Sequence, residues 1–169
     1  MAQKMIAAAL VLTATATIAF AKTQARVPAE QCPSITILSD ATRITQMAGE
    51  KIDLKAEIRD PALSCAVTGG TASSKLSFWV KSAIAPTSDI APRSVPYFVA
   101  IIANGEVIAK EVFDLKLNFT SDRMLKVKES VAKIEIPIAE GKEAQDYSVT
   151  IGFQLTEAQA DYNRTAASR

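Results

Sequence analysis

The chain contains no histidine. This absence excludes a Ser-His-Asp triad, a Cys-His pair and a histidine general base, which are common arrangements in nucleophilic and acid–base catalysis. A zinc or copper site would have to use the two cysteines, Cys32 and Cys65, together with Met47 and Met124. The sequence therefore predicts a non-enzymatic protein with no metal and no cofactor.

Other chemical motifs are scarce as well. Neither a glycine-rich phosphate loop nor a D-x-D-x-D calcium loop occurs. Ser130-Val-Ala-Lys133 matches S-x-x-K, but it lies in an alternating stretch, where residues three apart point to opposite faces. An alternative stays open: a small-molecule or glycan-binding protein, or a weak hydrolase using carboxylates, would need a concave pocket lined by two or more acids or aromatics. The aromatic residues fall mostly on predicted core faces, which argues against a sugar-stacking groove.

Long apolar runs are also missing beyond the N-terminus. There, Lys4 precedes an apolar stretch that ends in Ala19-Phe20-Ala21, the three-part pattern of a secretory signal peptide. The stretch is shorter than the roughly 20 apolar residues that cross a bilayer. We expect cleavage after Ala21, with Ala25 as the second choice. The product is predicted to be periplasmic or extracellular, without a transmembrane span and with at most peripheral membrane association.

Export determines how the cysteines are interpreted. In an oxidising compartment, a pair of cysteines indicates a disulfide, here Cys32–Cys65, which stabilises a loop of this size by about 3–4 kcal/mol. The sequence Pro-Ala-Glu-Gln at 28–31 precedes Cys32, where a lipid-attachment cysteine would need a short apolar box. A lipid anchor is therefore not expected.

Charge of either sign is not in excess. Removal of residues 1–21 takes only Lys4 from the 19 basic residues, which leaves 18 basic and 18 acidic residues. The charges are interspersed, as in Lys51/Asp53/Lys55/Glu57. Because no basic stripe is visible, nucleic acid is not an expected partner.

The most frequent pattern in the sequence is the alternation of apolar and polar residues, with a period of two. Lys51–Ile58 alternates apolar and charged residues, as a half-buried antiparallel strand does. Further strands are predicted at 34–38, 75–84, 97–103, 106–119, 131–138 and 147–155. Together they predict an all-β fold, an immunoglobulin- or fibronectin III-like antiparallel β-sandwich with a short C-terminal helix. The predicted divisions are 1–21 signal peptide, 22–31 flexible lead, 32–164 sandwich and 165–169 disordered tail.

Local signals set the expected boundaries. Asp60-Pro61 is expected to end the second strand, and residues 85–96 to form a proline-rich loop. Asn104-Gly105 predicts a tight hairpin turn. Thr156 and Gln159 have the spacing of a capping box, which predicts a helix over 157–163.

Two aromatic residues bear on the type of sandwich. Tyr147 begins a strand after a loop, where a tyrosine corner is expected. Trp79 is expected to be the buried sandwich tryptophan, with Phe78 facing outward or lying under a loop; the alternative makes Trp79 an anchor for a partner. Because Val149 occupies the place of the second immunoglobulin cysteine, the disulfide is not expected to join the sheets in the antibody manner.

Several segments resemble a family of small exported, often lipoprotein-like proteins of alphaproteobacteria whose function is unassigned. The resemblance lies in residues 95–100, 109–113, 147–156 and 161–164, together with the Cys32-Pro33 and Leu63-Ser-Cys65 motifs. It implies export and supplies no activity, substrate or site residue. This chain departs from the lipoprotein members by lacking a suitable lipid-attachment cysteine.

These observations favour a non-enzymatic periplasmic or cell-envelope protein, a protein-interaction or structural accessory domain that binds another envelope protein or component. Sandwich domains usually act through loops and sheet edges. Two segments are the expected contact regions, the loop 85–96 and the C-terminal segment 156–164. The candidate interaction residues are Trp79, Pro92, Arg93, Tyr162, Asn163 and Arg164.

Overall fold

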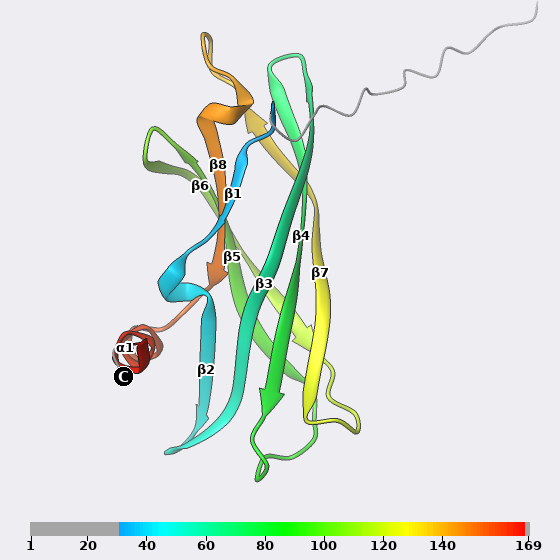
Figure 1. Cartoon of the computed structure of the whole chain (residues 1–169), viewed down its shortest axis with the longest axis vertical. Helices are drawn as coiled ribbons and strands as arrows, with labels where there is room; N and C mark the ends of the chain where they lie inside the picture. Colours follow the sequence, from blue (N-terminus) through cyan, green and yellow to red (C-terminus); the bar gives the residue numbers. More distant parts are fainter. Residues whose placement is uncertain (1–30, 168–169) are drawn as a thin grey trace, which may run out of the picture.

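The computed structural model describes residues 31–167 (Figure 1). The predicted signal peptide, residues 22–30 of the predicted lead and residues 168–169 of the predicted tail lie outside the described residues. Within them, nearly all regular structure is β, and one helix, α1 (Glu157–Ala167), follows the last strand. The predicted all-β architecture with a short C-terminal helix is confirmed.

Eight strands form two four-stranded sheets. Sheet A has the order β1 (Ser34–Ile37), β8 (Tyr147–Phe153), β5 (Arg93–Ala103) and β6 (Glu106–Leu117). Sheet B has the order β2 (Arg43–Ala48), β3 (Lys51–Thr68), β4 (Thr71–Ile84) and β7 (Met124–Pro137). β1 and β8 run parallel, and the other paired strands are antiparallel. Two short 3-10 turns, η2 (Ser39–Ala41) and η3 (Ala144–Asp146), complete the described elements.

The core lies between the two sheets, because alternate residues along the strands are apolar and point toward the opposite sheet. Leu54, Ala56 and Ile58 of β3 are buried against strands of sheet A, which contribute residues such as Val149 and Ile151. An aromatic cluster joins the layers: Phe78 meets Tyr97 edge-on at 5.2 Å between ring centroids, and Phe113 stacks on Tyr97 at 5.2 Å. The Tyr97 hydroxyl donates to Glu129 across the sheets at 3.2 Å. Burial raises the pKa of Tyr97, and the negative charge of Glu129 adds to this.

The predicted disulfide Cys32–Cys65 is confirmed. Cys32 lies two residues before β1 of sheet A, and Cys65 lies within β3 of sheet B. The bridge therefore joins the two sheets, although near the first strand rather than at the antibody position. The bridge joins both sheets because β3 extends beyond the predicted end at Ile58 and therefore contains Cys65.

The expectation that Asp60-Pro61 ends the strand was wrong. β3 continues to Thr68 through a bulge, in which two residues of β3, Asp60 and Pro61, lie opposite one residue of β4. Asp60 takes a positive φ of 51°, and the pairing with β2 has already ended at Glu57. Proline is tolerated at a bulge on a locally unpaired strand edge, because no ladder hydrogen bond needs its missing N–H.

Other local predictions are confirmed. Asn104-Gly105 forms the β5–β6 turn with positive φ at both residues, 53° and 80°. The Tyr147 hydroxyl accepts a hydrogen bond from the Ala139 N–H at 3.0 Å, which is the expected corner. Thr156 and Gln159 form the reciprocal capping box, and the helix then continues to Ala167 rather than to residue 163. The strand β2 was not predicted.

Candidate binding surface

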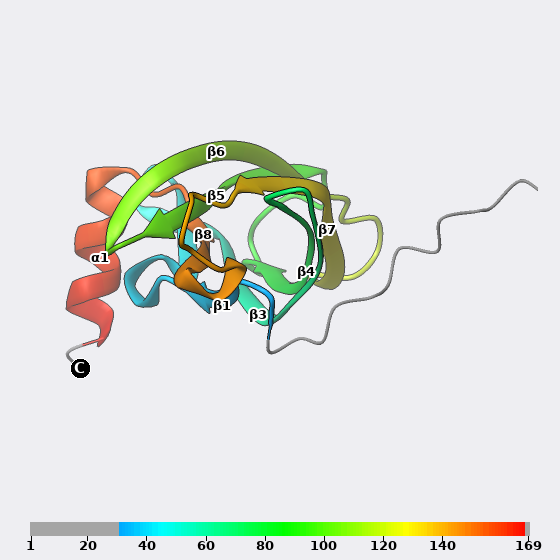
Figure 2. The same cartoon turned by 90° about the horizontal axis from the view of Figure 1, so that it is seen from above.

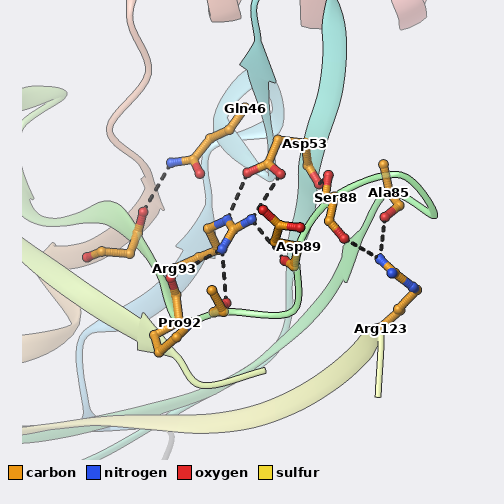
Figure 3. Close-up of polar contacts among 10 residues, drawn as sticks. Gln46, Asp53, Ala85, Ser88, Asp89, Pro92, Arg93 and Arg123 are labelled. Atoms are coloured by element: carbon orange, nitrogen blue, oxygen red, sulfur yellow. Dashed lines mark hydrogen bonds and ion pairs between the residues drawn. The ribbon is translucent and has the colours of Figure 1, made fainter. Parts of the chain in front are cut away.

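The loop between β4 and β5 is fixed by an ion pair that joins the two sheets (Figure 3). Arg93, the first residue of β5, donates through Nε and Nη2 to the Asp53 carboxylate at 2.8 and 3.1 Å. Both side chains are about four-fifths buried, with exposed fractions of 19% and 18%. Hydrogen bonds from Arg93 and Ser88 lower the pKa of Asp53 despite the opposing effect of burial, so the carboxylate stays ionised.

The rest of this loop is held by backbone contacts. Arg93 also donates to the carbonyl oxygens of Asp89, Ala91 and Pro92. Arg123 donates to the carbonyls of Ala85 and Ser88, both at 2.7 Å (Figure 3). The structure therefore places the predicted contact residue Arg93 at the start of β5, so that the predicted loop 85–96 ends at Pro92, which is exposed.

The outward face of sheet B gathers basic side chains from all four strands. Since Leu54, Ala56 and Ile58 point inward, the residues between them point outward. One row across the sheet holds Arg43, Glu57, Lys81 and Lys126, and the next holds Arg59, Trp79 and Lys128. Lys55 stands beside Ala83 and Met124 on the other side of the first row. We call this set the cationic face: Arg43, Lys55, Arg59, Lys81, Lys126 and Lys128, with Glu57 as its one acidic member.

Ion pairs bind Glu57 and the nearby Asp53 but leave lysines of this face without a carboxylate partner among the described residues. Glu57 is held between Arg43 at 3.1 Å and Arg59 at 2.9 Å. Partial burial raises the pKa of Glu57, but the hydrogen bonds and charges of these two arginines outweigh it, so the pKa lies below its usual value. Asp53, at a bulge in the β2–β3 pairing, is bound by Arg93. No ion pair among residues 31–167 involves Lys55, Lys81 or Lys126.

The expectation of no basic stripe was therefore wrong. Basic and acidic residues alternate along the chain, but neighbouring strands place their basic residues beside one another. Lys81 and Lys126 are far apart in sequence and directly paired across β4 and β7. A single sequence does not reveal this register, which is why the cluster was missed.

Trp79 lies on the cationic face, and the expectation that it is the buried sandwich tryptophan was wrong. Phe78 is the core residue, with 1% exposure, and Trp79 is partly exposed. The period of two explains this, because Leu76, Phe78 and Val80 share the inward side of β4. The Lys126 ammonium lies 4.3 Å and the Lys128 ammonium 6.0 Å from the Trp79 ring centroid. The ring is thus flanked by two cations.

A groove of about 950 Å³ runs across part of the cationic face, between sheet B and α1. Its floor includes Lys55, Lys81 and Lys126, and Met124, 77% exposed, also lines it. α1 lies beside β2 (Figure 1) and forms the opposite wall. Of the charged residues in the lining, five are basic and two acidic: Arg43, Lys55, Lys81, Lys126 and Arg164 against Asp40 and Glu57.

The helix is fastened by two amides. Asn163 donates to the carbonyls of Asp40 and Arg43, and Gln159 donates to the carbonyl of Thr45. Tyr162, 41% exposed, and Arg164, paired with Asp161, line the groove. Of the predicted interaction residues, Tyr162, Asn163 and Arg164 therefore lie together at the groove. Trp79 lies on the cationic face outside the groove lining, and Pro92 and Arg93 lie elsewhere, at the end of the β4–β5 loop and the start of β5.

The remaining motifs form no reactive cluster in the part of the chain that the structure describes. The Ser130 hydroxyl donates to the Leu76 carbonyl, and Lys133 pairs with Glu135 at 2.8 Å. Over residues 31–167, no group of three His, Cys, Asp or Glu side chains could hold a metal ion. No helix in the same range is long and apolar enough to cross a membrane.

Comparison with family models, with curated proteins and with solved structures gives no match.

Proposed function

We propose that this chain is an exported, non-enzymatic binding domain of the cell envelope, and that its ligand is an anionic oligosaccharide held in the groove between sheet B and α1. The observation that carries the proposal is the set of three lysines without ion-pair partners among the described residues, on the floor of a groove of about 950 Å³. Lysine ammonium groups on flexible stems attract carboxylates and phosphates as point charges.

The groove suits a sugar chain better than an extended peptide. It crosses β2, β3, β4 and β7 over their side chains, so a peptide in it would find no strand edge to pair with. The β2 carbonyls at residues 43 and 45 are already occupied by α1. Sugar hydroxyls both donate and accept hydrogen bonds, while Tyr162 and the neighbouring Trp79 offer aromatic surface. An anionic glycan can therefore use lysines and aromatic rings together.

A hydrolytic role is less well supported. The groove contains two acids, Asp40 and Glu57, as the alternative interpretation required. However, Glu57 is kept ionised by its two arginines, whereas a glycosidase needs one carboxyl group with a raised pKa to protonate the leaving group. We therefore favour binding without cleavage.

The proposal also includes export of the chain, its family and its fold subtype. The N-terminal pattern Lys4 to Ala21 and the disulfide support a periplasmic or extracellular site, and the segments described above support kinship with small exported alphaproteobacterial proteins. The immunoglobulin- or fibronectin III-like subtype is supported at the level of two packed sheets and a tyrosine corner. Its connectivity differs, because the last two strands, β7 and β8, lie in different sheets, whereas the last two immunoglobulin strands, F and G, lie in the same sheet.

The test is calorimetric titration of the purified exported chain with polygalacturonate fragments, with dextran as the neutral polymer and polyglutamate as the acidic peptide. Replacement of Lys55, Lys81 and Lys126 by Gln should weaken polygalacturonate binding by about threefold to a hundredfold, since each exposed ion contact contributes about 0.2–1 kcal/mol. The matched control replaces Lys51, Lys116 and Lys142, which are exposed and outside the groove lining, and has the same net charge.

The control variant should bind within about twofold of the wild type, and added salt should weaken the binding because it screens exposed charges. Equal losses of affinity in both triple variants would show that binding depends on net charge alone and would contradict the assigned site. Tighter binding of polyglutamate than of polygalacturonate would show that the groove takes an acidic protein segment instead.

A further inference from the structure

A second surface of the molecule is an open strand edge. β6 is the last strand of sheet A, and it pairs on one side with β5. Figure 2 shows it arching along the outside of the molecule. Every residue from Glu106 to Val112 is exposed, and the exposed fractions of Val107, Ile108 and Val112 are 60%, 52% and 51%.

The other edges are short, covered or charged, which are the usual ways in which proteins prevent strands from associating. β1 has four residues. The carbonyls of β2 accept hydrogen bonds from α1. β7 carries Lys126, Lys128, Lys133 and Glu135, and it ends in Pro137. β6 is charged as well, but unlike β7 it exposes three β-branched apolar side chains, Val107, Ile108 and Val112, along an open ladder.

The outward side chains of β6 are complementary to themselves. Phe98 points away from the sandwich core and pairs with Val112, so Val112 and its alternate neighbours Lys110 and Asp114 share the outer face of sheet A. The Lys110 ammonium lies 4.5 Å from the Phe98 ring centroid, and neither Lys110 nor Asp114 has an ion-pair partner among residues 31–167. The outer face therefore presents, in order along the strand, a positive, an apolar and a negative residue.

This order fits an antiparallel copy of the same strand. A two-fold axis through Val112, perpendicular to the sheet, places Val112 opposite its own copy. It also places Lys110 opposite Asp114 of the second copy, and Asp114 opposite Lys110. An axis through Lys110 or through Glu111 would instead place like charges opposite each other, which is destabilising. This axis leaves the outward-facing residues of both copies on the same side, so the two sheets become one continuous sheet.

We propose that β6 pairs with β6 of a second copy of this chain, in antiparallel register centred on Val112. The bulge in the β5–β6 pairing at Ile108 limits the regular ladder to about the stretch from Ala109 to Leu115. So short an interface predicts a weak dimer, with a dissociation constant on the order of 0.1 mM. The proposal is independent of the groove, which lies on sheet B.

The experiment is sedimentation analysis of the purified exported chain over a range of concentrations, in the absence of any glycan. Lys110→Asp places two pairs of opposed acids in the interface, and Asp114→Lys places two pairs of opposed lysines there. Because the two-fold axis doubles each change, either variant should weaken association by about tenfold or more. The double variant, Lys110→Asp with Asp114→Lys, restores opposite charges and should restore association to within about twofold of the wild type.

Circular dichroism and thermal melting establish that each variant is folded before association is compared. A wild-type chain that remains monomeric to about 1 mM would overturn the self-pairing, because a monomer at that concentration excludes the expected affinity. Single charge reversals without effect, or a folded double variant that fails to re-associate, would overturn this register.

Discussion

The outer faces of the two sheets share one backbone pattern but carry different side chains. On sheet A, β1 and β8 present small hydroxyl residues such as Thr36 and Thr150, whose side chains are hydrogen-bonded to each other at 3.0 Å. Next to them, Phe98 and Ala100 are buried under Ala41 of η2. On sheet B, the corresponding positions carry lysine, arginine and Trp79.

The difference shows how a chain with balanced charge produces a charged surface. The face of sheet A is partly closed by the chain's own turn η2, so it needs small and apolar residues there. The face of sheet B is open apart from α1 at its β2 edge, and the acid of the cationic face, Glu57, is bound by two arginines. Strand register, rather than composition, therefore creates the cationic face.

The largest expected effect comes from enlarging a residue on the closed face. A Cβ at Gly152 would lie 2.8 Å from the Ala41 Cβ and 3.0 Å from ring atoms of Phe98. Gly152→Val should lower the free energy of unfolding by about 2–3 kcal/mol, as overpacking does. The matched change on sheet B is Ala83→Val, at the open groove, and should cost less than about 0.5 kcal/mol. Denaturant titration of both variants checks this, and equal costs would mean that the faces do not differ in packing.

A smaller effect is expected at the Asp53–Arg93 ion pair, which joins the two sheets. Asp53→Asn should lower the free energy of unfolding by about 1–2 kcal/mol at neutral pH, because Arg93 then loses a largely buried ionic partner. The folded-state pKa of Asp53 lies below its ordinary value of 3.8. The stability it supplies is therefore fully present above about pH 4 and is lost as the pH falls through the lowered pKa.

Chemical denaturation at several pH values measures this dependence. The wild type and Asp53→Asn should differ most near pH 7 and converge below pH 4. A difference that stayed constant down to pH 2 would show that the ion pair contributes nothing and that the variant acts through packing alone.

The next effect concerns binding rather than stability. Glu57→Gln removes the one acid of the cationic face and should strengthen polygalacturonate binding about two- to fivefold, with little change in stability. Asp114→Asn on the outer face of sheet A makes the same change in net charge and should leave this binding unchanged. Calorimetry at low salt checks the pair, and equal gains in both variants would mean that the two faces do not differ as binding surfaces.

The smallest expected effect concerns the aromatic ring beside the lysines. Trp79→Phe keeps an aromatic ring and should change polygalacturonate binding by less than about twofold, whereas Trp79→Ser should weaken it about two- to fivefold. Because Trp79 points away from the core, neither change should alter the fold, which circular dichroism can verify. Equal binding by both variants would show that the Trp79 ring does not contribute to the binding surface.

The sequence predicted features that depend on neighbours along the chain. The alternation from Lys51 to Ile58, the Asn104-Gly105 turn, the Tyr147 corner and the Thr156–Gln159 cap are local, and each occurs in the structure. The disulfide followed from the cysteine count and the expected compartment.

The failures concern long-range pairing. Pro61 does not end β3, because a bulge and the end of β2 leave its nitrogen without a required partner. The side of β4 that faces inward could not be chosen between Phe78 and Trp79 until sheet A was placed against it. Lys81 and Lys126 became neighbours only through the β4–β7 pairing. Helix α1 was predicted, but not its position beside β2, which forms the groove wall.

The most direct test of the central claim is a nuclear magnetic resonance titration of the isotope-labelled chain, without residues 1–21, with polygalacturonate fragments. The open cationic face predicts that backbone shifts change at Lys55, Lys81, Lys126 and Tyr162, and remain constant at Thr36, Ser148 and Thr150 on sheet A. Shifts confined to sheet A or to the loop 85–92, or no shifts at all at saturating ligand, would contradict the assignment of the groove on sheet B as the binding surface.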